Sequence, residues 1–131
     1  KRWSEHLNIK INLKPKFFPP KDPHLPAKFT IAANLLGTKI IFGHELLKKL
    51  WSEEKDISDE KNIEEVSSSF KIDFRELSTL AKSEKVSEIY TKNTKEAVEK
   101  NVFGAPSYIF NDELFWGQDR LEFLERALKN A

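Results

Sequence analysis

The sequence predicts an α/β protein that is mostly helical and carries a single β-hairpin near its C-terminus. Apolar residues recur at helical spacing through most of residues 26–101, whereas two short runs rich in aromatic and β-branched residues follow at 108–110 and 114–116. Leu121, Leu124 and Leu128 then return to helical spacing. We therefore expect a long helical region, then a hairpin, then a final helix.

The hairpin and the final helix have recognisable boundary residues. Asn111-Asp112 separates the two strands and suits the positive-φ positions of a tight turn. Asp119 stands where a helix N-cap belongs, and Glu122 three residues later would complete a capping box. We predict two domains: a helical one over residues 1–100 that includes a preceding extended segment, and a C-terminal one over 101–131.

Several helices are expected between residues 26 and 101. One runs over 26–36 with Gly37 as its C′ residue, and a second runs over 38–51 with Ile40, Ile41 and Leu47 among its inward residues. The later ones start at Ser58 or Asp59, at Asp73 with Glu76 as a capping box, and at Ser83.

The N-terminal segment combines a helix end with an extended stretch. Trp3 and Leu7 lie four apart, which is typical of the last turns of an amphipathic helix. Ile9, Ile11 and Leu13 alternate with polar residues, and this period of two predicts an extended segment with one buried face. Two prolines at 19 and 20 then interrupt regular structure.

Composition limits the function classes. At 131 residues the chain can bury one hydrophobic core, no apolar run is long enough to span a membrane, and no signal-peptide h-region is present. Without cysteine, these residues supply no thiolate, disulfide or zinc-thiolate site. His6, His24 and His44 form no metal-ligand pattern, so we predict no metal site.

Charge is unevenly distributed along the chain. Residues 1–50 contain ten Lys and Arg against three Asp and Glu, and residues 51–131 contain twelve against eighteen. The basic half could attract an anionic small molecule. Its lysines are scattered and lack interleaved aromatic residues beyond Phe17-Phe18, so nucleic acid is not an expected partner, and neither is a membrane.

Two C-terminal motifs carry a family resemblance that covers essentially the whole chain. Asn-Val-Phe-Gly-Ala-Pro at 101–106 and Leu-Phe-Trp-Gly-Gln-Asp-Arg-Leu at 114–121 resemble the 2-hydroxychromene-2-carboxylate isomerase family, relatives of kappa-class glutathione transferases and DsbA-type oxidoreductases. The resemblance implies a thioredoxin-like fold with a large helical insertion. It also implies that a first strand-helix-strand unit, absent here, stands upstream.

The resemblance further implies glutathione as cofactor and two turns that bind it. Ala105-Pro106 corresponds to a cis-proline turn, whose backbone would pair with the cysteinyl part of glutathione. Gln118 and Asp119 correspond to a pair that resembles a clamp for the γ-glutamyl group. From spacing alone, Asp119 is an ordinary N-cap, and the two roles are compatible.

An aromatic-derived carboxylate is the substrate class that the resemblance implies. Phe17 and Phe18 would line the cleft that holds a flat substrate, or they simply close the core under a loop. Trp116 and Arg120 would line the same cleft, although Trp116 suits the core of the second strand equally well. No residue in the chain supplies a nucleophile or general base, and the family's catalytic serine would lie upstream.

Three hypotheses follow. The first is a glutathione-dependent isomerase or transferase, cytoplasmic, whose 131 residues are inactive on their own. The second is a DsbA-like thiol oxidoreductase, which an upstream Cys-X-X-Cys would establish. The third is a non-catalytic remnant or association module. Because the strand after Pro106 would lack its neighbour, we also expect a homodimer or a rearranged hairpin.

Overall fold

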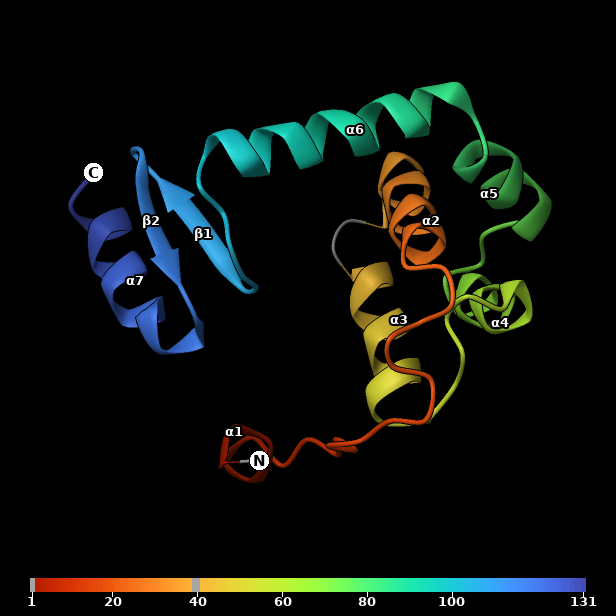
Figure 1. Ribbon diagram of the computed structural model, residues 1–131, viewed down its shortest axis with the longest axis horizontal. Helices are drawn as coiled ribbons and strands as arrows, with labels where there is room; N and C mark the ends of the chain where they lie inside the picture. The colour runs from red at the N-terminus through yellow and green to blue at the C-terminus, as the bar shows by residue number, and fades with distance from the viewer. Residues whose placement is uncertain (1, 39–40) are drawn as a thin grey trace. The chain divides into compact units, whose positions relative to one another are not determined.

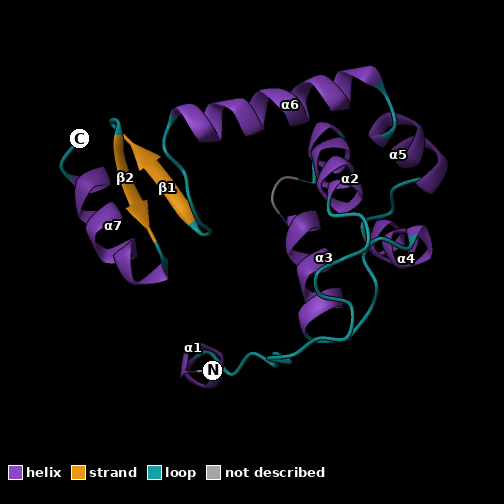
Figure 2. Ribbon diagram, viewed as in Figure 1, coloured by secondary structure: helices purple, strands orange, loops and turns teal. Residues whose placement is uncertain are grey.

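A computed structural model describes residues 2–38 and 41–131 of the chain. They form two compact units, Lys1–Tyr90 and Thr91–Ala131 (Figure 1). The first unit is helical, and the second contains the hairpin and the final helix (Figure 2). The expected order of helices, hairpin and helix is confirmed.

Helix α2 is the centre of the first unit. It packs against α3 and α5, and α4 lies against both of these helices. Phe29 of α2 stacks on Phe74 of α5 with ring centroids 5.9 Å apart, and Phe42 of α3 meets Phe70 at 5.6 Å. The helices of this unit are α1 (Arg2–His6), α2 (His24–Leu35), α3 (Ile41–Trp51), α4 (Glu60–Ser69), α5 (Phe74–Ala81) and the first part of α6 (Glu84–Glu99). The buried core comprises Phe29, Ala32, Ala33, Phe42, Leu46, Ile63, Val66, Leu77, Ala81 and Val86.

Polar side chains start three of these helices where the sequence places them. The Asp59 carboxylate accepts from Lys61 N at 3.0 Å, and the Asp73 carboxylate accepts from Glu76 N at 3.0 Å. Ser83 Oγ accepts from Val86 N at 3.3 Å at the start of α6. Each bond satisfies a backbone N–H that the first helical turn leaves without a carbonyl partner.

Helices α2 and α3 differ from their predicted forms. Helix α2 begins two residues before Pro26, because the Asp22 carboxylate accepts from the N–H groups of His24 and Leu25 and so starts the turn earlier. In α3, Ile41 and Leu47 are exposed, so the prediction that they face inward is wrong. Its buried stripe is Phe42, Leu46 and Leu50, each four residues apart. Ile40 lies outside the described residues.

The stretch from Ile9 to Leu13 forms no strand, and the prediction that it buries one face is wrong. Ile9, Ile11 and Leu13 are between 42 and 60% exposed. The segment is held by backbone contacts instead, because Asn12 N donates to Trp51 O at 2.7 Å at the end of α3. A period of two shows which side chains share a face and not whether another element covers it.

The second unit consists of the last part of α6, strands β1 (Ser107–Phe110) and β2 (Glu113–Trp116), the 3₁₀ turn η1 (Gln118–Arg120) and α7 (Leu121–Lys129). The strands pair antiparallel, with Phe110 opposite Glu113 and Ser107 opposite Trp116. Asn111 and Asp112 have φ of 49° and 61°, which confirms the tight turn. Helix α7 packs against both strands, and Phe115 is the only buried side chain in this fully described unit.

Asp119 is not the N-cap of the final helix. The 3₁₀ turn comes first, and α7 begins only at Leu121 with Arg120 as its N-cap and no capping side chain. The capping box of Asp119 and Glu122 is therefore a wrong prediction. Gly117 explains the difference, because its φ of 99° turns the chain before a helix can start. The Asp119 carboxylate is left free of a capping role.

Candidate functional site

One hydrogen bond joins the two turns that the sequence singles out. The peptide bond between Ala105 and Pro106 is cis, as the resemblance implies, and it directly precedes β1. The N–H of Gly117 donates to the carbonyl of Pro106 at 2.9 Å. This bond extends the ladder by one pair beyond Ser107 and Trp116. The hairpin thus places Ala105-Pro106 and Gly117-Gln118-Asp119 side by side at its open end.

Trp116 packs against the backbone of the first turn. A side chain at Gly104 would place its Cβ 2.5 Å from Trp116 Nε1, so only glycine admits the indole at this distance. Ser107 Oγ donates to the carbonyl of Gly104 at 2.6 Å and closes the turn from the other side. Trp116 is 52% exposed, which excludes the alternative that it is a core residue of β2.

Ala105 offers unpaired backbone groups. Among the described residues, neither its N–H nor its carbonyl has a hydrogen-bond partner, and the residue is exposed. Backbone groups in this state can pair with an extended peptide-like ligand as a neighbouring strand would. The turn can therefore bind a peptide through its main chain, whatever the side chain at 105.

The second turn carries opposite charges on neighbouring residues. Arg120 N donates to the carbonyl of Gly117 at 3.2 Å, which closes the 3₁₀ turn. The carboxylate of Asp119 lies 4.0 Å from the Arg120 guanidinium, and both side chains are more than half exposed. Gln118 is exposed beside them. At that separation each charge stays available for a ligand group, because an exposed pair contributes little.

Phe17 and Phe18 belong to the first unit. Phe18 is 55% exposed and lies against Trp51 with ring centroids 4.9 Å apart. Lys16 Nζ lies 5.3 Å from the centre of the Phe17 ring. Phe18 is therefore not a core residue. The peptide bond between Phe18 and Pro19 is also cis, which was not predicted from the sequence.

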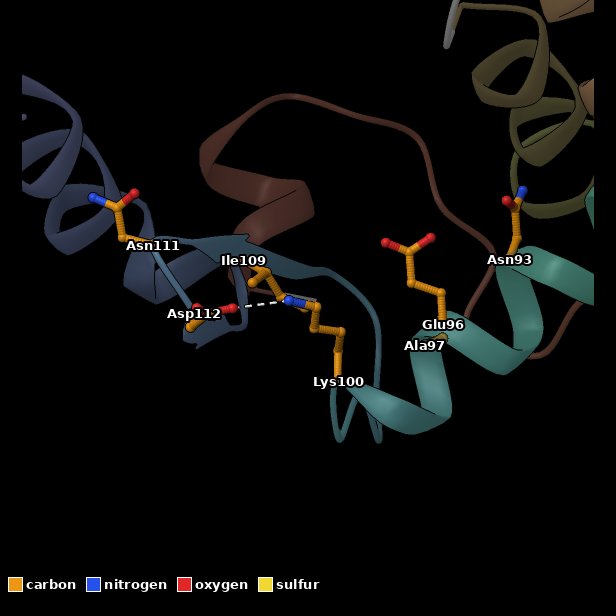
Figure 3. Close-up of a pocket in the computed structure, with 7 residues that line it drawn as sticks. All are labelled: Asn93, Glu96, Ala97, Lys100, Ile109, Asn111 and Asp112. Carbon is orange, nitrogen blue, oxygen red and sulfur yellow. Dashed lines mark hydrogen bonds and ion pairs between the residues drawn. The ribbon is translucent and has the colours of Figure 1, made fainter.

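A separate hollow of about 540 Å³ lies in the second unit (Figure 3). Lys100 Nζ donates to Asp112 Oδ1 at 2.8 Å across it. The Lys100 ammonium holds the pKa of the Asp112 carboxyl below its usual range, first through the hydrogen bond and then through charge attraction. The same bond raises the pKa of Lys100. The lining residues are Asn93, Glu96, Ala97, Lys100, Ile109, Asn111 and Asp112, and none was a predicted site residue.

Sequence reasoning missed three features of this unit. The first is the contact between the rings of Phe103 and Trp116, and the second is the packing of the Trp116 indole on Gly104. The third is the ion pair of Lys100 and Asp112. Phe103 directly precedes the Gly-X-Pro element, and that position was the available signal. Among the residues that the structure describes, no group of three metal-ligating side chains occurs. Nor is any helix of the described part long and apolar enough to cross a membrane.

The fold and the turn define a class of protein. A C-terminal antiparallel hairpin with a cis proline at its entrance and a helix behind it is thioredoxin-like. The family model described as a DSBA-like thioredoxin domain matches residues 1–129, and the chain belongs to this family.

The similar proteins agree on one name. The 2-hydroxychromene-2-carboxylate isomerase of Pseudomonas sp. strain C18 is 43% identical over 49 residues, which are 37% of this chain and 23% of the relative. The enzyme of that name from Sphingobium xenophagum is 49% identical over 39 residues, 30% of this chain and 20% of the relative. A solved 2-hydroxychromene-2-carboxylate isomerase superimposes with a TM-score of 0.75 at 24% identity, covering 98% of this chain and 62% of its own. The family resemblance and the fold class are thereby confirmed, and the chain spans less than two thirds of that isomerase.

Proposed function

We propose that the chain is part of a glutathione-dependent isomerase acting on an aromatic-derived carboxylate. The observation that carries the proposal is the 2.9 Å bond from Gly117 N to Pro106 O, because it places the two candidate glutathione turns together. The names of the similar proteins supply the reaction class. The glutathione contacts are assigned to Ala105, Pro106, Gln118 and Asp119.

Each part of glutathione has a matching group in this arrangement. The unpaired N–H and carbonyl of Ala105 would hold the cysteinyl segment as a short strand pair. The carboxylate of Asp119 would accept from the ammonium of the γ-glutamyl group, since a bond between ionised groups is among the stronger polar contacts. Gln118 would bond the glutamyl carboxylate through its side-chain amide. The residues present therefore fit the cofactor.

The substrate would lie beside the same turns. Trp116 presents an exposed indole face, and Arg120 can hold a carboxylate with two parallel hydrogen bonds. The role of Phe17 and Phe18, which lie in the first unit, stays a prediction from the family resemblance. When bound, glutathione supplies the thiol that adds to the substrate. The residues of this chain bind and orient both molecules.

The family match also supports a second function, a DsbA-like thiol oxidoreductase. The two functions make different demands on Asp119. An isomerase that keeps glutathione bound needs the γ-glutamyl contact, whereas an oxidoreductase that exchanges protein thiols needs only the backbone pairing at Ala105. The third hypothesis, an association module, requires neither contact.

Calorimetric titration separates these functions. Glutathione is titrated into the wild-type chain, into Asp119→Asn and into Asp112→Asn, which removes an exposed carboxylate from the other end of the hairpin. We expect Asp119→Asn to weaken binding about tenfold and Asp112→Asn to leave it unchanged. The dipeptide Cys-Gly lacks the γ-glutamyl group, so it is expected to bind more weakly than glutathione and with an affinity that neither substitution changes. Equal glutathione affinity in wild type and Asp119→Asn would contradict the proposal.

A further inference from the structure

Phe103 lies in an unusual position for a large apolar side chain. It is 71% exposed, yet its ring lies against Trp116 with centroids 5.0 Å apart and planes inclined at 57°. Trp116 is itself 52% exposed. Leaving two large aromatic rings in water forgoes the burial that stabilises a core, and exposed apolar patches commonly mark binding surfaces.

The position of this aromatic pair, Phe103 and Trp116, is fixed by the backbone. The indole rests on Gly104, where any Cβ would come within 2.5 Å of Nε1. Ser107 Oγ closes the same turn by its bond to the Gly104 carbonyl. The pair is therefore built on the turn that carries Ala105-Pro106 and does not depend on the core of the first unit.

Two inclined and partly exposed rings offer a flat molecule both a face and an edge. Aromatic rings prefer offset or edge-to-face contacts, and these contribute about 0.5–1.5 kcal/mol beyond area burial. A planar conjugated ring can make both contacts at once, whereas a saturated ring has no π-face for stacking or for an aromatic edge to meet. Arg120 stands three residues after Gly117, where the chain leaves β2, and it would supply a cation for an acid group on the same molecule.

We propose that Phe103 is a specificity-determining residue that, with Trp116, selects planar conjugated carboxylates as substrates. This inference rests on the proposed function and assigns a residue and a selection rule to its substrate side. Phe103 acts by direct contact with the conjugated plane of the substrate. It takes no part in holding glutathione.

The test compares trans-cinnamate with 3-cyclohexylpropanoate, which has the same charge but a saturated ring. Binding to the 131-residue chain is followed by the indole N–H signal of Trp116 in ¹H–¹⁵N NMR spectra, assigned by its loss in Trp116→Phe. Phe103→Leu keeps apolar bulk and removes the aromatic face. Phe103→Tyr keeps the ring, and Val98→Ala is the control, because Val98 is 70% exposed in the same unit.

We expect Phe103→Leu to weaken cinnamate binding about threefold to tenfold. Phe103→Tyr, which keeps the ring, and Val98→Ala are expected to bind cinnamate as the wild type does. Cyclohexylpropanoate is expected to bind weakly to every variant. Unchanged cinnamate affinity in Phe103→Leu, equal affinity for the two acids, or no cinnamate binding by the wild type would each overturn the inference.

Glutathione, titrated into the same samples, distinguishes this inference from the proposed function. We expect its affinity to be equal in wild type and Phe103→Leu. If glutathione does not bind while cinnamate binding depends on Phe103, the proposed cofactor fails and the aromatic pair stands. If glutathione binds through Asp119 but Phe103→Leu leaves the affinity for cinnamate unchanged, the inference fails and the proposed function stands.

Discussion

The N–H of Gly117 donates to the carbonyl of Pro106 at 2.9 Å, across the open end of the hairpin. The bond connects two turns that are separated by the whole hairpin in sequence. It also fixes which residue pairs of the ladder are hydrogen-bonded, because hydrogen-bonded and non-hydrogen-bonded pairs alternate along two antiparallel strands. Tyr108 and Phe115 are therefore a bonded pair, and the N–H groups of Ser107 and Ile109 point away from β2.

Gly117→Ala is expected to loosen the junction of the two turns. Gly117 has φ of 99° and ψ of 154°, a region that other residues enter at a cost of about 1–3 kcal/mol. A Cβ there would also lie 2.5 Å from Asp119 Oδ1, so the carboxylate must move. Hydrogen exchange of the β1 and β2 amides measures the effect, and faster exchange is the expected result.

Gly37→Ala provides the control for this substitution. Gly37 has a similar φ of 94°, but no atom lies within 4 Å of the added Cβ, and the residue belongs to the first unit. It is expected to lower the stability of the first unit and leave hairpin exchange unchanged. Equal protection of the hairpin in wild type and Gly117→Ala would show that the junction does not depend on this backbone conformation.

The two aspartates that were predicted to form capping boxes, Asp73 and Asp119, are expected to affect stability differently when they are replaced. Asp73→Ala removes the bond to Glu76 N and should lower the free energy of unfolding by about 1 kcal/mol. Asp119→Ala removes no capping bond and should change stability by less than about 0.5 kcal/mol. Urea unfolding of both variants measures this. If Asp119→Ala lowers the free energy of unfolding as much as Asp73→Ala does, Asp119 caps the final helix after all, contrary to the structure.

The ion pair of Lys100 and Asp112 is expected to depend on pH. Because the pKa of Asp112 is lowered in the folded chain, its contribution to stability is present above the unfolded pKa and is lost as pH falls through the folded one. Lys100 has a raised pKa, so its contribution is lost only as pH rises through that value. NMR titration of the Asp112 carboxyl should show a midpoint below that of an ordinary aspartate.

Lys100→Met should return the midpoint of Asp112 to the ordinary range, and added salt should shift it in the same direction. Lys95→Met is the control, because the partner of Lys95 is Glu99, at 3.8 Å. A midpoint for Asp112 that ignores Lys100→Met would mean that the ion pair does not form in solution. Because the pair is exposed, its contribution to stability is small, and the titration midpoint of Asp112 is the quantity to measure.

The free edge of β1 bears on the expected homodimer. Within residues 2–38 and 41–131, β1 pairs only with β2, and exposed strand edges tend to pair with another chain. Ile109→Pro removes an outward N–H without removing a bond to β2, so it should dissociate a dimer formed at this edge. Sedimentation of wild type and Ile109→Pro measures this, and a monomeric wild type would contradict the expected dimer.

Local chemistry explains which elements could be predicted. Asn111 and Asp112 specify a tight turn by themselves, and Asp59, Asp73 and Ser83 specify helix starts by bonds within one turn. Asp119 has the same spacing to Glu122 as a capping box, yet Gly117 and the 3₁₀ turn displace the helix start. Spacing records which residues could bond and not the backbone path that decides whether they do.

Longer-range features lay beyond the sequence for a similar reason. The burial of Ile9, Ile11 and Leu13 depends on a covering element that their alternation does not specify. The contact of Phe103 with Trp116 depends on the register that brings residue 116 opposite residue 107. Ala105, Pro106, Gln118 and Asp119 were proposed from the resemblance, and the hydrogen bond from Gly117 to Pro106 supplies the physical reason that their two turns adjoin.

The most direct test of the central claim is a ¹H–¹⁵N NMR titration of the chain with glutathione. The claim is that the two turns joined by Gly117 and Pro106 form one glutathione site. It predicts saturable shifts with a single affinity at Ala105, Gln118 and Asp119, all reduced together by Asp119→Asn. Shifts confined to one turn, shifts centred on the hollow at Lys100 and Asp112, or no saturable shift would contradict it.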